Sequence, residues 1–379
     1  MISIRFPTNI KIKSGILKDI YQYLQELNIH KPLVVTDSNI IELNFFQELL
    51  KTLNRNKVMF NIFSETSGNP VKSDVEKGTQ TFQENACDGI LIIGGGCALD
   101  VGKAIALMAR HKGDLFEYED GKKDAKTIVD NIPSILAVPS TAGTGSEVGG
   151  SSVISDDKTH KKYIIWSPFL VPKLVIADPM ILTGLPAQVT ASTGIDALSH
   201  NLEAFLVASQ HPFADAIATE GISLVHKSLI KSFKEPQNIE ARTDMLLASM
   251  MGATAFQKGL GVVHSCAHAL STCYNLHHGL AIATTLRAGL KFNLEAVEFK
   301  IKKLGRIIAP SQNENNLVNS FFDWLDSLYL ELSLPQKLSK LNVKLTDNLI
   351  HTAFNDSCHL SNPRKCSKDD FINIFEKSL

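Results

Sequence analysis

The sequence predicts two parts of different fold class, an N-terminal α/β part with a parallel sheet and a C-terminal part made of helices. From about residue 30 to 110, short β-rich runs such as PLVVTD, VMFNIF and GILIIGGG alternate with helical periodicity, which is typical of parallel strands joined by crossover helices. From about residue 188, Ala, Leu and Ser at helical spacing dominate and β-branched runs become scarce. The 379 residues exceed the roughly 250 to 300 at which one core stops growing, so we expect two domains, 1–185 and 186–379.

The predicted elements follow from local patterns. Helices are expected over residues 39–53 and 71–86 and from about residue 98. Further strands are expected at SILAVPS, KKYIIW and KLVIAD, so the α/β half ends near Asp178. In the helical half, Gly259 and Gly261 mark one break, and Pro335 and Pro363 mark two more.

Charge and composition exclude several classes of partner. Lysine plus arginine (38) nearly equals aspartate plus glutamate (39), so no global field attracts a nucleic acid or an anionic membrane. The start, MISIRFPTNIKIKSG, alternates polar and apolar residues, and no apolar run approaches about 18 residues, which predicts a cytoplasmic protein. The six cysteines form no CxxC pair, so we expect reduced thiols and no zinc cluster built on them.

The segment GILIIGGGCALDVGKAIALMA combines a buried strand pattern, a glycine turn and a helix pattern. This order places backbone N–H groups and a helix N-terminus where a pyrophosphate can bind. The spacing does not match GxGxxG, however, and no acidic residue follows in the usual ribose-binding position. A tight turn that binds nothing is therefore the alternative.

Two polar sites follow other predicted strands. Asp37 ends PLVVTD, where a carboxylate can accept hydrogen bonds from ribose hydroxyls and repel a 2′-phosphate, which favours NAD over NADP. Asp37 and Ser38 would also cap the helix predicted over 39–53, so a structural role stays open. The loop PSTAGTGSE offers Ser140, Thr141 and Thr144 as donors near a cofactor, although such clusters are common in plain loops.

Carboxylate and imidazole groups at helical spacing give the strongest chemical signal. Asp196 and His200 lie four residues apart, hence on one face of a helix, and the spacing recurs at His264 and His268 before a tandem HH pair. One such pair is more often a surface hydrogen bond. Two pairs and a further histidine within apolar segments indicate a metal site, and the mixed oxygen and nitrogen donors suit Fe(II), Zn(II) or Mn(II). Spacing alone leaves the ligand set open among five or six residues.

The segments GGGCALDVGK, PSTAGTGSE, DPMILTGLP, GIDALSHNLEAF and HSCAHALSTCYNLHHG, in this order, resemble the iron-containing (group III) alcohol dehydrogenase family. The resemblance spans nearly the whole chain and extends to the late NDSCHLSNPRKCSKDDFINIF. It implies a Rossmann-like dinucleotide-binding domain and a helical metal-binding domain, an architecture similar to that of dehydroquinate synthase. It also implies an active site in the cleft between the domains, and a homodimer.

By motif position, the resemblance implies a metal held by Asp196, His200, His264 and His278. It implies iron, although zinc fits the same ligand types. It places His268 near the nicotinamide, where this residue passes the alcohol proton on, instead of among the ligands. The dinucleotide positions that it implies are Asp37, Gly95, Gly96, Asp100, Lys103, Thr141, Thr144 and Lys162, to which we add Ser140 and Cys97.

The sequence departs from the family pattern at a few positions. Cys97 stands where serine is usual, and because a thiol is a weaker donor than a hydroxyl, we expect one phosphate hydrogen bond to be weakened. Ala269 replaces a usual proline, and Leu276 with His277 replaces a proline-containing approach to His278. None of these changes removes a ligand.

The predicted function is hydride transfer between NAD and a small primary or secondary alcohol or aldehyde, with the metal polarising the substrate oxygen. The alternatives are a hydroxy-acid dehydrogenase or an oxo-acid or maleylacetate reductase of the same family, a glycerol dehydrogenase-like enzyme, and a protein that keeps the fold without catalysis. The extra ligand in DALSH argues against a glycerol dehydrogenase. The intact ligand set argues against a non-catalytic protein.

Overall fold

A computed structural model describes residues 8–379, and residues 1–7 of the alternating N-terminal segment lie outside this range. The described residues divide into two compact units. The sheet unit comprises residues 8–141 and 145–184, and the helical unit comprises residues 142–144 and 185–379. The short segment 142–144, within the loop after a predicted strand, thus belongs with the helices.

The sheet unit is built on a six-stranded parallel sheet in the order β1-β8-β5-β4-β2-β3. All residues of the central strand β4 are buried, because its apolar run GILIIG is covered on both faces. The predicted parallel α/β sheet is therefore confirmed. Its strands are β1 (Asn9–Ile12), β2 (Pro32–Val35), β3 (Asn61–Phe63), β4 (Gly89–Gly94), β5 (Ser134–Pro139) and β8 (Leu174–Ala177).

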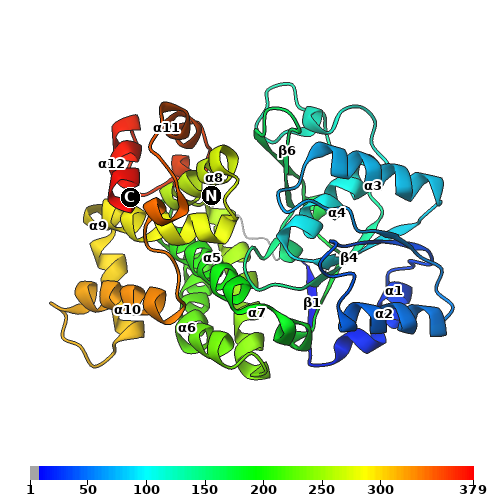
Figure 1. The fold of residues 1–379 in the computed structure, drawn as a ribbon, viewed down its shortest axis with the longest axis horizontal. Coiled ribbons are helices and arrows are strands. Elements are labelled where there is room, and N and C mark those ends of the chain that lie inside the picture. The colour runs from blue at the N-terminus through cyan, green and yellow to red at the C-terminus, as the bar shows by residue number, and fades with distance from the viewer. Residues whose placement is uncertain (1–7) are drawn as a thin grey trace. The chain divides into compact units, whose positions relative to one another are not determined.

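The crossover helices of this unit form two packed pairs. Helices α1 (Ile20–Glu26) and α2 (Asn44–Arg55) contact each other, as do α3 (Lys72–Glu84) and α4 (Gly96–Met108) (Figure 1). From β2 the chain continues outward to β3, whereas from the neighbouring β4 it continues in the opposite direction to β5. Such a reversal opens a crevice at the carboxyl ends of the two strands, the usual ligand position in parallel α/β sheets.

One sequence-based expectation for this unit was wrong. The helix expected over residues 39–53 begins only at Asn44, because the backbone from Asp37 to Leu43 forms turns. The strand expected at KKYIIW is confirmed as β7 (Lys162–Trp166), and it lies outside the parallel sheet, in a hairpin with β6 (Ser151–Ser155). The serine-rich β6 gave no strand signal, and its Val153 N–H is held by the Asp100 carboxylate of α4.

The helical unit has α5 at its centre. From residue 194 to 206 every residue of α5 is buried, which means that polar side chains in this stretch face the interior. The prediction of an all-helical second half is confirmed for the described residues, and α8 begins just after the break predicted at Gly259 and Gly261. The helices are α5 (Ala187–Leu206), α6 (Pro212–Lys234), α7 (Ile239–Ala255), α8 (Val262–Tyr274), α9 (His278–Ile308), α10 (Leu317–Glu331), α11 (Asp347–Phe354) and α12 (Lys368–Ser378).

Within residues 8–379, no single helix is long and apolar enough to cross a membrane. The pair Ile239–Lys258 and Val262–Tyr274 passes that test only when the two helices are taken together, across a bend of 107°. All six cysteines are free thiols, as expected.

Candidate metal centre and dinucleotide site

Helix α5 brings an acidic and a basic metal-binding group into the interior of the helical unit. The Asp196 and His200 side chains are one turn apart and almost fully buried. Among the described residues, Asp196 Oδ1 and His200 Nδ1 have no hydrogen-bond partner. A buried polar atom without a hydrogen-bond partner destabilises the folded state by roughly 1 to 3 kcal/mol. This pair therefore destabilises the protein unless a ligand binds between the two side chains.

Two further histidines approach the same carboxylate from other helices. His264 lies in the first turn of α8 and His278 is the first residue of α9. Three ring nitrogens surround Asp196 Oδ1, with His278 Nε2 at 3.5 Å, His264 Nε2 at 3.8 Å and His200 Nδ1 at 3.9 Å. The structure thus brings together the four residues predicted as metal ligands.

The donors at this cluster fit a divalent metal ion. His264 Nε2 is buried without a hydrogen-bond partner among the described residues, as are the Asp196 and His200 atoms. One ligand atom from each of these three residues lies within 4.8 Å of the others. One carboxylate with imidazoles suits Fe(II) or Zn(II), and no thiolate takes part.

The electrostatics of the cluster also suit a cation. Burial lowers the pKa of His200 to about 4 and that of His278 to about 3. Burial alone would raise the pKa of Asp196, but the surrounding histidines lower it below its usual range. Near neutral pH His200 and His278 are therefore neutral and Asp196 is ionised, the protonation states that a metal ion needs. Burial would also lower the pKa of His264, but the hydrogen bond and charge of Glu203 outweigh it and raise the pKa of this ring.

His268 has a different partner from the cluster. Its Nδ1 lies 2.8 Å from Asp356 Oδ2, and its ring stacks on that of His278 with centroids 5.4 Å apart. The other Asp356 oxygen accepts from Ser265 Oγ at 2.7 Å and from the Cys358 N–H at 2.9 Å. Asp356 was not predicted from the sequence, where its only signal was the resemblance of NDSCHLSNPRK to the family's terminal region.

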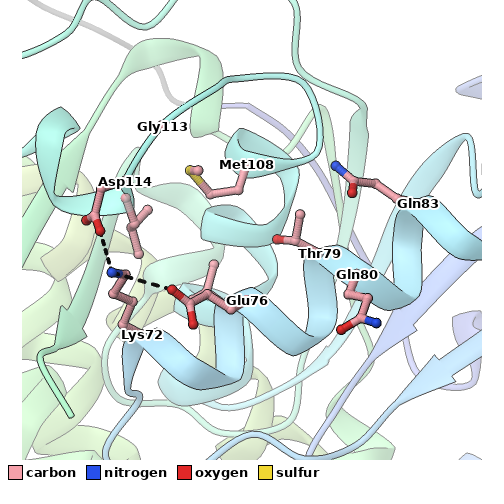
Figure 2. Close-up of a pocket in the computed structure, with 10 residues that line it drawn as sticks. Lys72, Glu76, Thr79, Gln80, Gln83, Met108, Gly113 and Asp114 are labelled. Atoms are coloured by element: carbon pink, nitrogen blue, oxygen red, sulfur yellow. Dashed lines mark hydrogen bonds and ion pairs between the residues drawn. The ribbon is translucent and has the colours of Figure 1, made fainter.

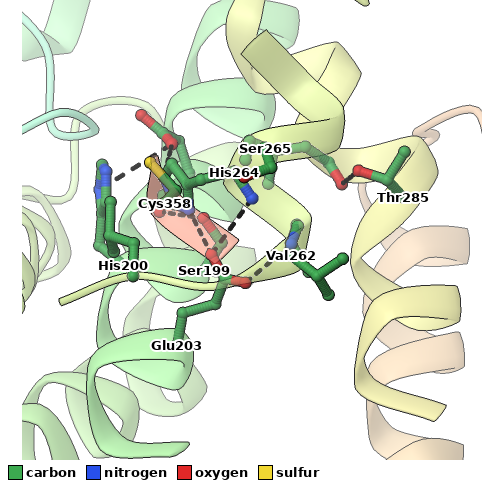
Figure 3. A network of polar contacts seen from close by, with 12 residues as sticks. Ser199, His200, Glu203, Val262, His264, Ser265, Thr285 and Cys358 are labelled. Carbon is green, nitrogen blue, oxygen red and sulfur yellow. Dashed lines mark hydrogen bonds and ion pairs between the residues drawn. The ribbon is translucent and has the colours of Figure 1, made fainter. Parts of the chain in front are cut away.

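Glu203 on α5 is a second carboxylate that was not predicted from the sequence. Its Oε2 lies 2.5 Å from His264 Nδ1, on the side of that ring opposite the unpaired Nε2. Figure 3 shows Glu203 reaching from α5 toward His264 and the start of α8. Its position in DALSHNLE, three residues after His200, was the available signal.

In the sheet unit, the predicted dinucleotide residues gather at the N-terminus of α4. Gly95 precedes this helix and Gly96 is its first residue. A Cβ at Gly95 would lie 3.2 Å from Thr141 Oγ1, so Thr141 lies directly beside the turn. Ser140 is buried, and its N–H donates to Gly94 O at the end of β4.

Charged residues surround the Cys97 thiol in the same turn. Burial raises the pKa of this thiol to about 12, and the charges of Asp100, Lys162 and Asp37 also act on it. The thiol donates to Gly68 O at 3.0 Å. Its hydrogen is thus used within the protein, where we had expected a weakened phosphate contact.

Asp37 lies just after β2, at the carboxyl end of that strand. One of its oxygens accepts from the N–H groups of Asn39 and Ile40 at 2.9 and 3.2 Å. Because α2 begins at Asn44, the idea that Asp37 caps this helix is wrong. Asp37 instead holds the turn after β2, and a ribose contact stays a prediction.

Asp100 and Lys103 organise the loop that follows β5. The Lys103 ammonium is fully buried and donates to Ser146 Oγ at 2.6 Å and to the carbonyl oxygen of Ser151. Asp100 accepts from Ser146 Oγ at 2.6 Å. These two residues thus hold the loop by hydrogen bonds within the sheet unit. Thr144, also predicted for the dinucleotide site, belongs to the helical unit.

A cavity of about 400 Å³ lies elsewhere in the sheet unit, along α3 (Figure 2). Its Lys72 ammonium is paired with Asp114 and, at 3.4 Å, with Glu76. The other lining residues are Val75, Thr79, Gln80, Gln83, Met108, Gly113 and Leu115. None of the predicted site residues lines this cavity, and its one ammonium group is already paired with two carboxylates.

Comparisons with known proteins identify the family. Residues 7–179 match the family model for iron-containing alcohol dehydrogenase, and residues 190–379 match that for the C-terminal domain of the Fe-containing alcohol dehydrogenase family. The chain therefore belongs to the iron-containing alcohol dehydrogenases. This confirms the predicted family, fold and enzyme class. It also confirms, at the level of the family, iron as the metal and NAD as the cofactor.

Several relatives share nearly their whole length with this chain. It is 33% identical to a 4-hydroxybutyrate dehydrogenase of Cupriavidus necator and 30% identical to a NAD-dependent methanol dehydrogenase of Bacillus methanolicus, with full coverage of both chains in each case. The crystal structure of a 1,3-propanediol oxidoreductase superposes with a TM-score of 0.94 at 31% identity, again over both whole chains.

Gly279 allows α9 to begin close to α5, and its replacement gives a first prediction. A Cβ at position 279 would lie 2.3 Å from Ser192 O, a backbone atom that can move only if α5 itself shifts. We expect Gly279→Ala to displace His278, to lower metal content after reconstitution, and to destabilise the protein by about 1 to 3 kcal/mol in urea unfolding. Gly184→Ala is the control, because its Cβ would meet no atom within 4 Å. Equal behaviour of the two variants would contradict this packing argument.

Glu147, in the loop after β5, predicts a pH dependence of stability. Its carboxyl is almost fully buried, and burial raises its pKa from 4.5 to about 7. The unfolded chain loses this proton at lower pH than the native protein, so the native state loses stability as pH rises from about 4.5 to about 7. Glu147→Gln should remove this loss and exceed the wild type at pH 8 by up to roughly 3 kcal/mol.

The measurement is urea unfolding of both proteins at pH 4.5, 6 and 8. The difference in free energy of unfolding should grow with pH in this range. A difference that stays constant from pH 4.5 to 8 would show that the buried carboxyl does not titrate as argued.

Proposed function

We propose that this chain oxidises small primary or secondary alcohols with NAD, and reduces the matching aldehydes or ketones, using a metal ion held by Asp196, His200, His264 and His278. The observation that carries the proposal is the set of buried donor atoms on α5 and α8 that have no partner among the described residues. When bound, the metal supplies a Lewis acid for the substrate oxygen and the dinucleotide accepts or gives the hydride.

The role of His268 follows from its hydrogen bond. Because Nδ1 donates to the Asp356 carboxylate, Nε2 is the nitrogen left to accept a proton. The ring is held a second time by its stacking on His278. His268 is therefore positioned to take the alcohol proton and pass it on, with Asp356 fixing its tautomer and orientation.

The dinucleotide is proposed to bind at the sheet crevice between β2 and β4. Its pyrophosphate would meet the N–H groups of Gly95, Gly96 and Cys97 at the start of α4. Asp37 lies at the end of the neighbouring strand, where its negative charge favours a free ribose 2′-hydroxyl over a 2′-phosphate. NAD is thus preferred to NADP.

The substrate is best sought among short alcohols. Relatives named for methanol and 4-hydroxybutyrate, together with the structure named for 1,3-propanediol, indicate a panel of n-alcohols, diols and 4-hydroxybutyrate. Each would be assayed with NAD on protein reconstituted with Fe(II) or Zn(II). Turnover of at least one alcohol that requires the metal supports the proposal, and binding of neither metal nor NADH would sink it. Selective use of 4-hydroxybutyrate would favour the hydroxy-acid alternative.

A homodimer and a cytoplasmic location complete the proposal. Both rest on the sequence: the dimer on the family resemblance, and the location on the lack of an apolar run that approaches about 18 residues. Sedimentation of the purified protein would test the first of these.

Replacing two histidines of α8 should separate metal binding from proton transfer. His264→Ala removes a ligand, so metal content and activity should fall together. His268→Ala should retain the metal and lower kcat by about 100-fold or more, because only a proton acceptor is lost. Elemental analysis and steady-state kinetics on the same preparations measure both. Loss of metal from His268→Ala would return this residue to the ligand set.

Replacing Asp37 should change the choice of dinucleotide. Asp37→Gly removes the charge that opposes a 2′-phosphate, so the ratio of kcat/KM for NADP to that for NAD should rise at least about tenfold, or about 1.4 kcal/mol. Asn39→Gly, in the same turn, keeps the N–H that Asp37 binds and should leave the ratio unchanged. An unchanged ratio in both variants would restrict Asp37 to holding the turn.

A further inference from the structure

Glu203 is a buried carboxylate that bonds almost entirely to the first turn of α8. Its Oε1 accepts from the Val263 N–H at 2.8 Å, and its Oε2 accepts from the His264 N–H at 3.2 Å. Oε2 also accepts from His264 Nδ1 at 2.5 Å. The residue is only 4% exposed, so these contacts replace water for a charge that would otherwise be costly to bury.

The backbone before α8 leaves room for the Glu203 carboxylate, because a glycine stands at position 261. Gly261 precedes α8 and offers no side-chain cap. A Cβ at Gly261 would lie 2.6 Å from Glu203 Oε1 and 2.8 Å from Asn362 Oδ1, which accepts from the Val262 N–H. The positive end of α8 therefore receives its capping oxygens from α5 and from the loop before α12, and Glu203 supplies two of the bonds.

The contact with Nδ1 decides which nitrogen of His264 faces the cluster. Nδ1 carries its hydrogen toward Glu203, so in the neutral ring Nε2 keeps a free lone pair. That lone pair lies on the side of Asp196, where Nε2 has no hydrogen-bond partner among the described residues. A carboxylate behind a histidine in this way fixes the ring orientation and strengthens it as a ligand.

Glu203 also supplies negative charge close to the cluster. The predicted ligands include one carboxylate, Asp196, and three histidines, so a divalent ion would leave one positive charge without a balancing partner. Glu203 offers that balance from behind His264, in the same buried core. On α5, Asp196, His200 and Glu203 occupy positions i, i+4 and i+7, which lie on one face of the helix. That face therefore carries two predicted ligands and the carboxylate that holds a third ligand, His264.

From this geometry we propose that Glu203 is a positioning residue for the metal: it holds His264 in the metal-binding tautomer, balances the ion's charge, and ties the site to the start of α8. The inference rests on the metal site of the proposed function. Glu203 itself does not touch the metal or the substrate.

The test uses Glu203→Gln, which preserves the size of the side chain and removes its charge. Co(II) is the probe, because its visible d–d absorption reports the ligand geometry at the site and its affinity is measurable against a chelator. We expect affinity for Co(II) to fall by about 10- to 100-fold, with an altered d–d spectrum. Glu147→Gln is the matched control, since it replaces another buried glutamate, one that belongs to the sheet unit, and it should leave both readouts unchanged.

A second variant separates positioning from simple support of the fold. Glu203→Asp keeps the charge on a shorter side chain and should recover part of the affinity lost in Glu203→Gln. Unfolding of the metal-free proteins measures the capping contribution alone. If the Gln and Asp variants lose affinity equally, in proportion to their loss of metal-free stability, the positioning role is overturned. It is also overturned if Glu203→Gln binds Co(II) within about twofold of the wild type.

The wild-type protein separates this proposal from the one on which it rests. Failure of the wild type itself to bind Co(II) would reject the metal site as a whole. Normal binding by the wild type with unchanged binding by Glu203→Gln would reject only the role of Glu203.

Discussion

The interaction on which the helical unit depends is the burial of the Asp196 carboxylate among imidazole rings. A charge in a protein interior is unfavourable unless it is paired, and three histidine nitrogens lie 3.5 to 3.9 Å from Asp196 Oδ1. Burial keeps the pKa values of His200 and His278 well below neutrality, so neither ring neutralises the carboxylate by protonation near pH 7. Glu203, which raises the pKa of His264, adds a second carboxylate to the same core. A bound cation resolves this conflict, because the same groups then become its ligands.

The rest of the unit places these groups with little freedom. Helix α5 is buried on all sides from residue 194 to 206 and fixes Asp196, while close packing at Gly279 and Gly261 brings α9 and α8 against it. Carboxylates then hold the rings of α8 from behind: Glu203 binds His264 and Asp356 binds His268. Two histidines one turn apart on one helix thus receive different surroundings, which is how one can serve as a ligand and the other as a proton acceptor.

Sequence reasoning found the four cluster residues because i,i+4 spacing and polar residues in apolar helices are local signals. It missed Glu203 and Asp356 because their partners lie 61 and 88 residues away, and neither residue type is unusual in a helix or a loop. The parallel sheet was predictable from its apolar runs, whereas β6 was not, since a serine-rich strand is held by a side chain of α4. Asp37 was placed correctly after its strand. The following helix begins only at Asn44, because the residues between them form a turn that helical periodicity does not reveal.

The central claim, that these buried donors share one catalytic metal ion, is tested most directly by anomalous X-ray scattering. Crystals of protein loaded with Fe(II) would be measured on both sides of the iron absorption edge. The claim predicts one strong anomalous peak within bonding distance of Asp196, His200, His264 and His278, with His268 bound to Asp356 and outside the coordination shell. A peak ligated by His268 and Asp356 instead, or no peak at Asp196 in protein that contains iron, would contradict it.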